Sequence, residues 1–331
     1  CNISDARHAG NYTLCIYLLK MREYYRWEKQ HSYNNPLSKD DIGNWITNRE
    51  ALWEELEQQD YQQLEINGQD LGPFDSDAAN QLLTPKNLIY SGGYGGKNKP
   101  HFFVADLESK KTLNGYNIYI SGREYARDLT SPPAMSHQNN VYIRRESFKR
   151  MLWERTDEWR WNKPENAMAK AIRCYDFDSD MEAALSDMTD NELEAATLHE
   201  IGEIQAGEKL PGWQQMMSDI SFTQAEIMAR AVRDHYADAL LTLPTLIEDS
   251  NHASIHFYFA NLTNMRKHLF PSLMKAYESW CTSYDISTIE TTVNDSLGYW
   301  KEIAEQMLAL HQQDAEQCSV RIEQLINGNK V

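Results

Sequence analysis

The chain has 331 residues, with 49 Asp and Glu against 32 Lys and Arg, which gives a formal net charge of −17. An acidic chain of this kind repels a phosphate backbone and an anionic membrane surface, so binding to nucleic acid or to a charged bilayer is disfavoured. Hydrophobic residues make up 41% of the chain and there are only 15 Gly and 10 Pro, which excludes a disordered or fibrous protein and predicts a folded core.

The sequence also carries expectations about location. No apolar run approaches the roughly 20 residues that a membrane-spanning helix requires. The first residues lack the basic start and the apolar middle of a secretory leader. The five cysteines are an odd number and lie far apart, as expected for reduced thiols rather than a disulfide framework. These features predict a cytoplasmic protein that does not span a membrane.

Two long helices are predicted at the N-terminal end. Apolar residues recur at three- and four-residue spacing through 5–29, after the capping oxygens of Ser4 and Asp5. The same period predicts a second helix over 40–63. Both patterns are amphipathic, so each helix should bury one face.

The next segment changes character and predicts a small antiparallel sheet. It is rich in Gly, Asn and Pro, and its short apolar runs are bounded by turn residues. Asn114-Gly115 favours the positive φ angles of a tight turn, which would join two of these strands as a hairpin. The predicted strands are 87–90, 102–105, 116–120 and 140–143.

From about residue 146 the periodicity is helical almost to the end, interrupted by prolines. The predicted helices are 146–159, 164–174, 190–208, 222–243, 252–281 and 286–326, the last as one helix or two. The expected fold class is therefore α+β and predominantly helical: a mixed region over 1–160, with long helices and a small antiparallel sheet, and an all-helical bundle over 161–331. Whether the two regions form separate domains is left open.

The segment 198–204 carries the sharpest chemical pattern in the chain. His199 and Glu203 stand one helical turn apart, so both project from one face and can bind a divalent metal. Glu200 between them is a candidate acid–base group. The pattern departs from the zinc-protease motif because Glu203 takes the place of a second His, and this oxygen-richer set of ligands shifts the expected metal from zinc towards iron or manganese.

Further ligands would have to come from other helices. Asp234 and Asp238 lie four residues apart in 222–243, and His256 lies in an apolar stretch after 252. The hypothesis is a metal-dependent enzyme with ligands His199, Glu203, Asp238 and His256 inside the helical bundle. The alternative is a non-catalytic binding or assembly protein, with a protein partner or a second copy of itself, in which the polar stripe forms ion pairs and His256 is a core histidine.

A second alternative is an anion-binding module. Lys97 and Lys99 follow a glycine-rich run, and Arg123 and Arg127 lie in a segment unusually rich in cations for this chain. Exposed backbone N–H groups and guanidinium groups can bind an acidic ligand. Neither phosphate-binding fingerprint is matched, and the interleaved acidic residues favour a structural role for the arginines.

Three blocks of the sequence resemble one known group of proteins. They are the opening Cys-Asn-Ile-Ser-Asp-Ala-Arg-His-Ala-Gly, the block Gly-Arg-Glu-Tyr-Ala-Arg-Asp at 122–128, and Leu-His-Glu-Ile-Gly-Glu at 198–203. Together they resemble an uncharacterised bacterial protein family that is catalogued as a domain of unknown function. The resemblance implies a bacterial protein but no activity, cofactor or catalytic residue.

Overall fold

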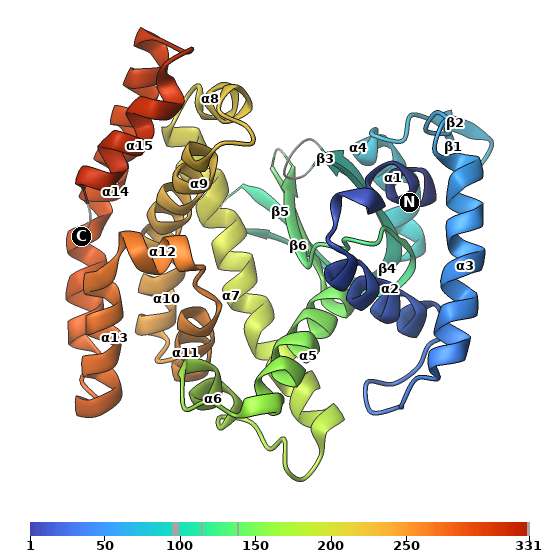
Figure 1. The fold of residues 1–331 in the computed structure, drawn as a ribbon, viewed down its shortest axis with the longest axis horizontal. Helices are drawn as coiled ribbons and strands as arrows, with labels where there is room; N and C mark the ends of the chain where they lie inside the picture. Colours follow the sequence, from blue (N-terminus) through green and yellow to red (C-terminus); the bar gives the residue numbers. More distant parts are fainter. Residues whose placement is uncertain (95–98, 114, 138, 330–331) are drawn as a thin grey trace. The chain divides into compact units, whose positions relative to one another are not determined.

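The computed structural model describes residues 1–94, 99–113, 115–137 and 139–329 (Figure 1). Its contacts divide the chain into two compact units, Cys1–Glu154 and Arg155–Val331, with the boundary inside helix α5 (Arg145–Asn162). Each unit has its own hydrophobic core. The predicted class, α+β and predominantly helical, is confirmed.

The first predicted helix is interrupted. The chain forms α1 (Asn2–His8), a 3-10 turn (Ala9–Asn11) and then α2 (Leu14–Glu28). The break falls where Gly and Asn are poor helix formers and where Thr13 is extended. The second predicted helix is α3 (Lys39–Leu56), which ends seven residues before the expected residue 63.

Helices α2 and α3 pack through aromatic rings. The ring of Tyr24 meets that of Trp45 edge to face, with centroids 5.7 Å apart. Trp53 is also buried in this cluster. Ser38 begins α3 by accepting a hydrogen bond from the backbone N–H of Asp41.

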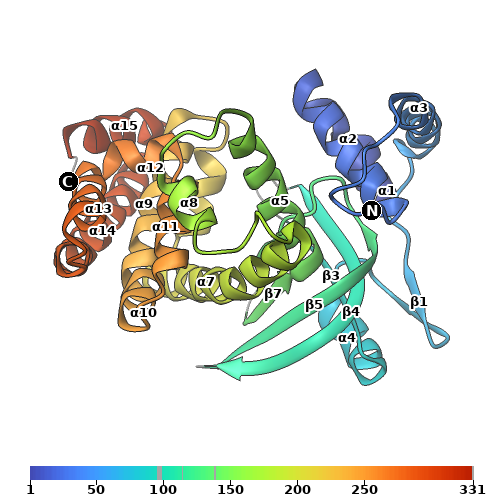
Figure 2. The same ribbon diagram turned by 90° about the horizontal axis from the view of Figure 1, so that it is seen from below.

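The sheet of the first unit has five strands in the order β3-β4-β5-β7-β6. Three of its four strand pairs are antiparallel and β5 pairs with β7 in parallel, which the sequence patterns did not predict. Helix α4 (Ser76–Leu83) packs against β3 (Figure 2). The strands are β3 (Leu88–Tyr94), β4 (Pro100–Leu113), β5 (Tyr116–Arg127), β6 (Ala134–His137) and β7 (Asn140–Arg144), and a separate hairpin is formed by β1 (Leu64–Ile66) and β2 (Gln69–Leu71).

A buried ion pair joins β5 to the end of β7. Arg144 donates two hydrogen bonds of 2.9 Å to the two carboxylate oxygens of Glu124, and both side chains are fully buried. Ser147 adds a hydrogen bond of 2.7 Å to the same carboxylate. Because a buried charge is costly without a partner, these three residues depend on one another.

The second unit consists of helices around one continuous core. Helix α9 lies at its centre and contacts α7, α12, α14 and α15. The predicted helix 252–281 is three helices, because Leu262 and Phe270 leave the helical conformation. The helices are α6 (Ala167–Ile172), α7 (Met181–Lys209), α8 (Trp213–Asp219), α9 (Gln224–Ala237), α10 (Leu243–Glu248), α11 (His252–Asn261), α12 (Asn264–Leu269), α13 (Pro271–Ser283), α14 (Ser287–Gln313) and α15 (Cys318–Gly328).

One turn of this unit departs from α-helical geometry. Residues Asp238–Thr242, between α9 and α10, form a π-helix, which accommodates one more residue per turn than the α-helix. Such turns are frequent at functional sites. In the part of the chain that the structure describes, no helix has both the length and the apolar character needed to cross a membrane.

Candidate functional site

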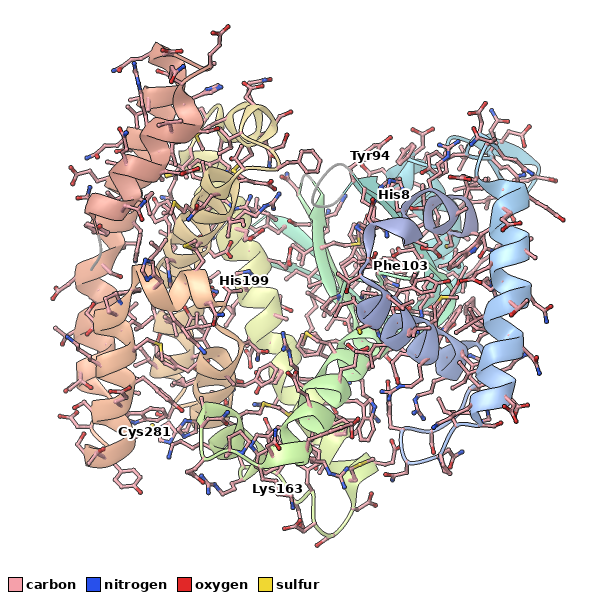
Figure 3. The ribbon with its side chains drawn as sticks, in the orientation of Figure 1. His8, Tyr94, Phe103, Lys163, His199 and Cys281 are labelled. Carbon is pink, nitrogen blue, oxygen red and sulfur yellow. The ribbon has the colours of Figure 1, made fainter. Side chains whose placement is uncertain are left out.

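His199 lies near the middle of α7, where Figure 3 labels it. Its Nδ1 atom is 2.7 Å from Oδ1 of Asp238, the first residue of the π-helical turn. The carboxylate of Asp238 is buried, with 1% of its side chain exposed, whereas 32% of the His199 side chain is exposed. The pair therefore has a buried orienting carboxylate and an imidazole that reaches the surface.

The close approach of α7 to α9 makes this contact available. A β-carbon on Gly202 would lie 2.7 Å from the backbone carbonyl oxygen of Ala237, so only glycine fits there without a shift. Gly202 is one turn from His199, and Ala237 directly precedes Asp238. The glycine thus explains how the two helices come near enough for the imidazole to reach the carboxylate.

Asp238 has a second charged partner. The guanidinium of Arg266, on α12, donates a hydrogen bond to Oδ2 of Asp238 through Nη2. The same guanidinium donates to the hydroxyl of Tyr258, on α11, at 2.8 Å. The backbone carbonyl of Arg266 in turn contacts Nε2 of His235 at 3.0 Å. This network fixes the carboxylate from the side opposite His199.

A second carboxylate lies on the exposed side of the imidazole. Oε1 of Glu203 is 3.7 Å from Nε2 of His199, one turn further along α7. It also accepts a hydrogen bond of 2.8 Å from Nη2 of Arg233, on α9. His199 is thus placed between two carboxylates, each of which also pairs with an arginine.

The charges and the burial of the site give its ionisable groups widely different pKa values. Burial lowers the pKa of His199, but Asp238, Glu203 and Asp234 outweigh it and raise that pKa to about 10. Burial and Glu203 raise the pKa of Asp234 to about 6, although Arg266 opposes them. Burial would raise the pKa of Asp238, but Arg266 and His199 hold it below its usual range. At neutral pH, His199 is therefore an imidazolium. The carboxyl group of Asp234, whose charge acts on it, has a pKa close to neutrality.

The structure brings together three of the four predicted metal ligands, namely His199, Glu203 and Asp238. His256 lies in a different cluster: its Nδ1 atom is 2.9 Å from the hydroxyl of Tyr277 and its ring stacks on Trp280. Burial lowers the pKa of His256 to about 4. Among the described residues, no three His, Cys, Asp or Glu side chains are arranged so that they could hold a metal ion.

The remaining residues of the site were not all foreseen. Glu200 is partly exposed on α7, next to His199 in sequence. Asp234 lies on the acidic face that the sequence predicts together with Asp238, whereas no sequence pattern indicates Arg233, Tyr258 or Arg266. Their only sequence signal is general: several carboxylates facing one core require cations nearby.

The predicted anion-binding residues do not form one group. Lys97 lies outside the described residues. Arg123 is exposed beside Tyr125, whereas Arg127 is buried, 3.8 Å from Glu124 and over the ring of Trp27. A β-bulge explains the difference, because β4 pairs Val104 with Ala126 but the next residue, Ala105, with Glu124. The extra residue reverses the alternation of the strand between the two arginines.

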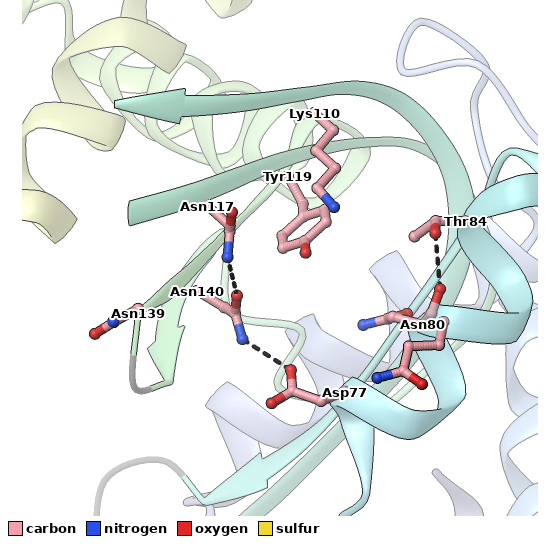
Figure 4. A pocket seen from close by; sticks show the side chains of 9 residues that line it. Asp77, Asn80, Thr84, Lys110, Asn117, Tyr119, Asn139 and Asn140 are labelled. Atoms are coloured by element: carbon pink, nitrogen blue, oxygen red, sulfur yellow. Dashed lines mark hydrogen bonds between the residues drawn. The ribbon is translucent and has the colours of Figure 1, made fainter. Parts of the chain in front are cut away.

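A cavity with a polar lining lies in the first unit (Figure 4). Its volume is about 580 Å³, which is within the range of small-molecule sites. Asn117 donates to Asn140 at 3.1 Å, and Asn140 donates to Asp77 at 2.9 Å. The amide-rich lining matches a small polar ligand, but it includes none of the residues of the His199 site.

Comparison with known proteins gives two family models that together cover most of the chain. Residues 1–144 match the N-terminal domain, and residues 149–329 the C-terminal domain, of a family of unknown function, DUF6866. No curated protein and no solved structure matches the chain.

Proposed function

We propose, for a chain that belongs to the DUF6866 family of unknown function, that its C-terminal domain is an enzyme whose acid–base group is His199. One observation carries this proposal: Asp238, buried and held by Arg266, accepts a hydrogen bond from Nδ1 of His199 at 2.7 Å. A buried carboxylate on one ring nitrogen fixes the tautomer and the orientation of an imidazole, as in hydrolytic triads. Nε2 then points away from Asp238, on the side where Oε1 of Glu203 lies 3.7 Å from it.

The roles of the side chains follow from their charges. As an imidazolium, His199 would donate the Nε2 proton to a leaving or developing anionic atom of the substrate. Asp238 would stabilise the charged ring before this step and orient the neutral ring after it. Asp234, whose pKa is about 6, would exchange protons near neutral pH. Carboxyl groups with separated pKa values are typical of sites that carry out acid–base catalysis.

Activity of matched variants tests the proposal. Wild type, His199→Gln, Asp238→Asn and the control His268→Gln, at an exposed histidine of α12, would be assayed on chromogenic esters, phosphates and glycosides. We expect turnover to fall roughly 100-fold or more in the first two variants, because a positioned acid–base group contributes about 10²–10⁴. Turnover that His199→Gln leaves unchanged would overturn the proposal.

Metal binding is a competing proposal for the same side chains. A histidine whose Nδ1 is held by a carboxylate is the common form of a metal ligand. Metal binding, however, requires a neutral imidazole and would compete with Arg233 for Glu203. Elemental analysis of purified wild type and His199→Ala distinguishes the two proposals: a stoichiometric metal lost in the variant supports the metal centre, and its absence from both supports acid–base catalysis without metal.

Partner binding is a second candidate function, in the first unit. Three leucines on one end of α2 are exposed, Leu14 at 69%, Leu18 at 45% and Leu19 at 52%. An exposed apolar cluster of this kind is typical of a protein-interaction surface. The test is the assembly state of the protein in solution after Leu14 and Leu19 are both changed to Gln. An unchanged assembly state would argue against this role.

A further inference from the structure

A cluster of cations surrounds Thr130 in the first unit and includes none of the residues of the proposed acid–base site. Nζ of Lys99 is 2.7 Å from Oγ1 of Thr130 and 3.4 Å from the hydroxyl of Tyr12. The two hydroxyl groups are themselves 2.7 Å apart. Two neutral hydroxyl groups thus surround one ammonium group. Because one of them donates to the other, one hydroxyl proton is left to donate to a ligand.

Lys20 contributes a second ammonium group. Its Nζ lies 5.4 Å from the centre of the Tyr12 ring, and Nζ of Lys99 lies 5.3 Å from the same ring centre. Over residues 1–94, 99–113, 115–137 and 139–329, no carboxylate forms an ion pair with either ammonium. Burial, together with the charges of Arg150 and Lys99, lowers the pKa of Lys20.

Arg150, on α5, is the third cation. It is buried, at 6% exposure, and its Nη2 donates to the backbone carbonyls of Thr130 and Ser131 at 3.4 and 2.9 Å. Its Nε atom is buried without a partner in the structure. A buried donor without an acceptor is costly, and an anionic oxygen would relieve that cost.

The carboxylates nearby are mostly engaged elsewhere. Asp128 accepts hydrogen bonds from the backbone N–H groups of Phe102 and Ser131 and contacts His101 at 3.3 Å. Glu154 pairs with Arg150 at 3.4 Å, but 39% of its side chain is exposed. Asp5 is buried, accepts from the backbone N–H of Leu129 and lies within the range of the charge of Lys99, and Glu154 and Asp128 act in the same way on Lys20. Of the three cations around Thr130, only Arg150 has a carboxylate at ion-pair distance among the described residues, on a chain whose net charge is −17.

We propose that Lys20, Lys99 and Arg150, with the hydroxyls of Tyr12 and Thr130, bind the phosphate group of a small ligand. A phosphate offers several anionic oxygens that can accept from two ammonium groups and from one hydroxyl donor at once. A nucleic acid does not suit the site, since the acidic chain would repel the rest of a polyanion. The proposed ligand is therefore inorganic phosphate or a small phosphate monoester.

Calorimetric titration tests this proposal in the full chain. Inorganic phosphate and phenyl phosphate would be titrated into wild type, Lys20→Met, Lys99→Met and Lys29→Met at constant ionic strength, so that general screening is the same in each experiment. Lys29 caps the same helix, α2, and is exposed, which makes it the matched control. Tighter binding of phenyl phosphate than of inorganic phosphate would identify a monoester as the ligand class, and the reverse would identify the free ion.

We expect wild type and Lys29→Met to bind with equal affinity and both other variants to bind at least tenfold more weakly. We also expect Lys20→Met to unfold at a higher temperature than wild type without phosphate, since it removes a half-buried ammonium that lacks a counter-ion. The proposal would be overturned if wild type bound neither ligand at a concentration of roughly 10 mM, ten times a millimolar Kd. Equal affinity in all four proteins would also overturn it. Neither result bears on His199, which the proposed site does not include.

Discussion

Gly202 of α7 lies so close to Ala237 of α9 that a β-carbon at position 202 would be 2.7 Å from the carbonyl oxygen of Ala237. This contact allows the pairing of His199 with Asp238, because both residues lie within one turn of it. The site therefore depends on the absence of a side chain at position 202 as much as on the side chains of His199 and Asp238.

Substitution of Gly202 tests this dependence. We expect Gly202→Ala to lower the free energy of unfolding by about 1–3 kcal/mol, because the added methyl group must push two helices apart. The matched control is Gly207→Ala on the same helix, where a β-carbon meets no atom within 4 Å. There alanine should stabilise the helix by about 0.5–1 kcal/mol. Denaturant unfolding of both variants measures the difference, and equal effects would contradict the close contact.

The charge of Asp238 should control the titration of His199. We expect the pKa of His199, about 10 in wild type, to fall towards its ordinary value of 6.5 in Asp238→Asn. Because the pKa of His199 is raised by folding, its contribution to stability is complete below pH 6.5 and is lost as the pH rises through 10. NMR titration of the imidazole gives the pKa directly. Asp249→Asn, at an exposed aspartate, should leave it unchanged.

Glu192 should make the protein less stable as the pH rises. Its side chain is buried on α7, and burial raises its pKa to about 7, against the hydrogen bonds from Asn191 and Tyr175. Between pH 4.5 and 7 the folded chain holds a proton that the unfolded chain has lost, so stability falls across this window. The free energy of unfolding of Glu192→Gln, relative to that of wild type, should therefore rise by about 2–3 kcal/mol from pH 5 to pH 8.

The matched control for this prediction lies two residues away. Glu194 is exposed on the same helix, so Glu194→Gln should follow the wild-type dependence on pH. Urea unfolding at several pH values measures all three proteins. Parallel curves for Glu192→Gln and wild type would show that Glu192 is ionised in the folded protein across this range.

The buried ion pair of the first unit should be costly to break. Glu124→Gln leaves the fully buried Arg144 without this opposite charge, and we expect the free energy of unfolding to fall by about 3–5 kcal/mol. Glu108 pairs with Arg145 at the surface, where 39% and 32% of the two side chains are exposed. Glu108→Gln should therefore change stability by less than about 1 kcal/mol. Thermal unfolding of the two variants compares them.

Local patterns in the sequence predict most elements but not their arrangement. Periodicity locates α2, α3 and most of the C-terminal helices, because burial of one helical face repeats with the turn of the helix. It does not predict the parallel pairing of β5 with β7, which depends on contacts between distant residues. Nor does it predict the bulge at Tyr125, which separates Arg123 from Arg127.

The site was predictable to the same extent. Spacing on one helix relates His199 to Glu203, since residues four apart share a face. Spacing cannot relate one helix to another. It therefore does not predict that Asp238 contacts His199, whereas His256 contacts Tyr277 instead. Arg266 and Tyr258 come from two further helices, and only the packed unit brings them to the carboxylate.

The π-helical turn at Asp238–Thr242 has a consequence for relatives of different length. The turn takes up one residue more than an α-helical turn, so deletion of one residue from 239–242 would restore an ordinary α-helix and leave the phase of the chain after it nearly unchanged. The pairing of Asp238 with His199 would survive, because Asp238 precedes the deletion, and Tyr258 and Arg266 would keep their place behind the carboxylate. The same deletion inside α9 would instead rotate Asp238 by about 100° about the helix axis and away from His199, so the site tolerates a change of length in this short stretch but not in the helix before it.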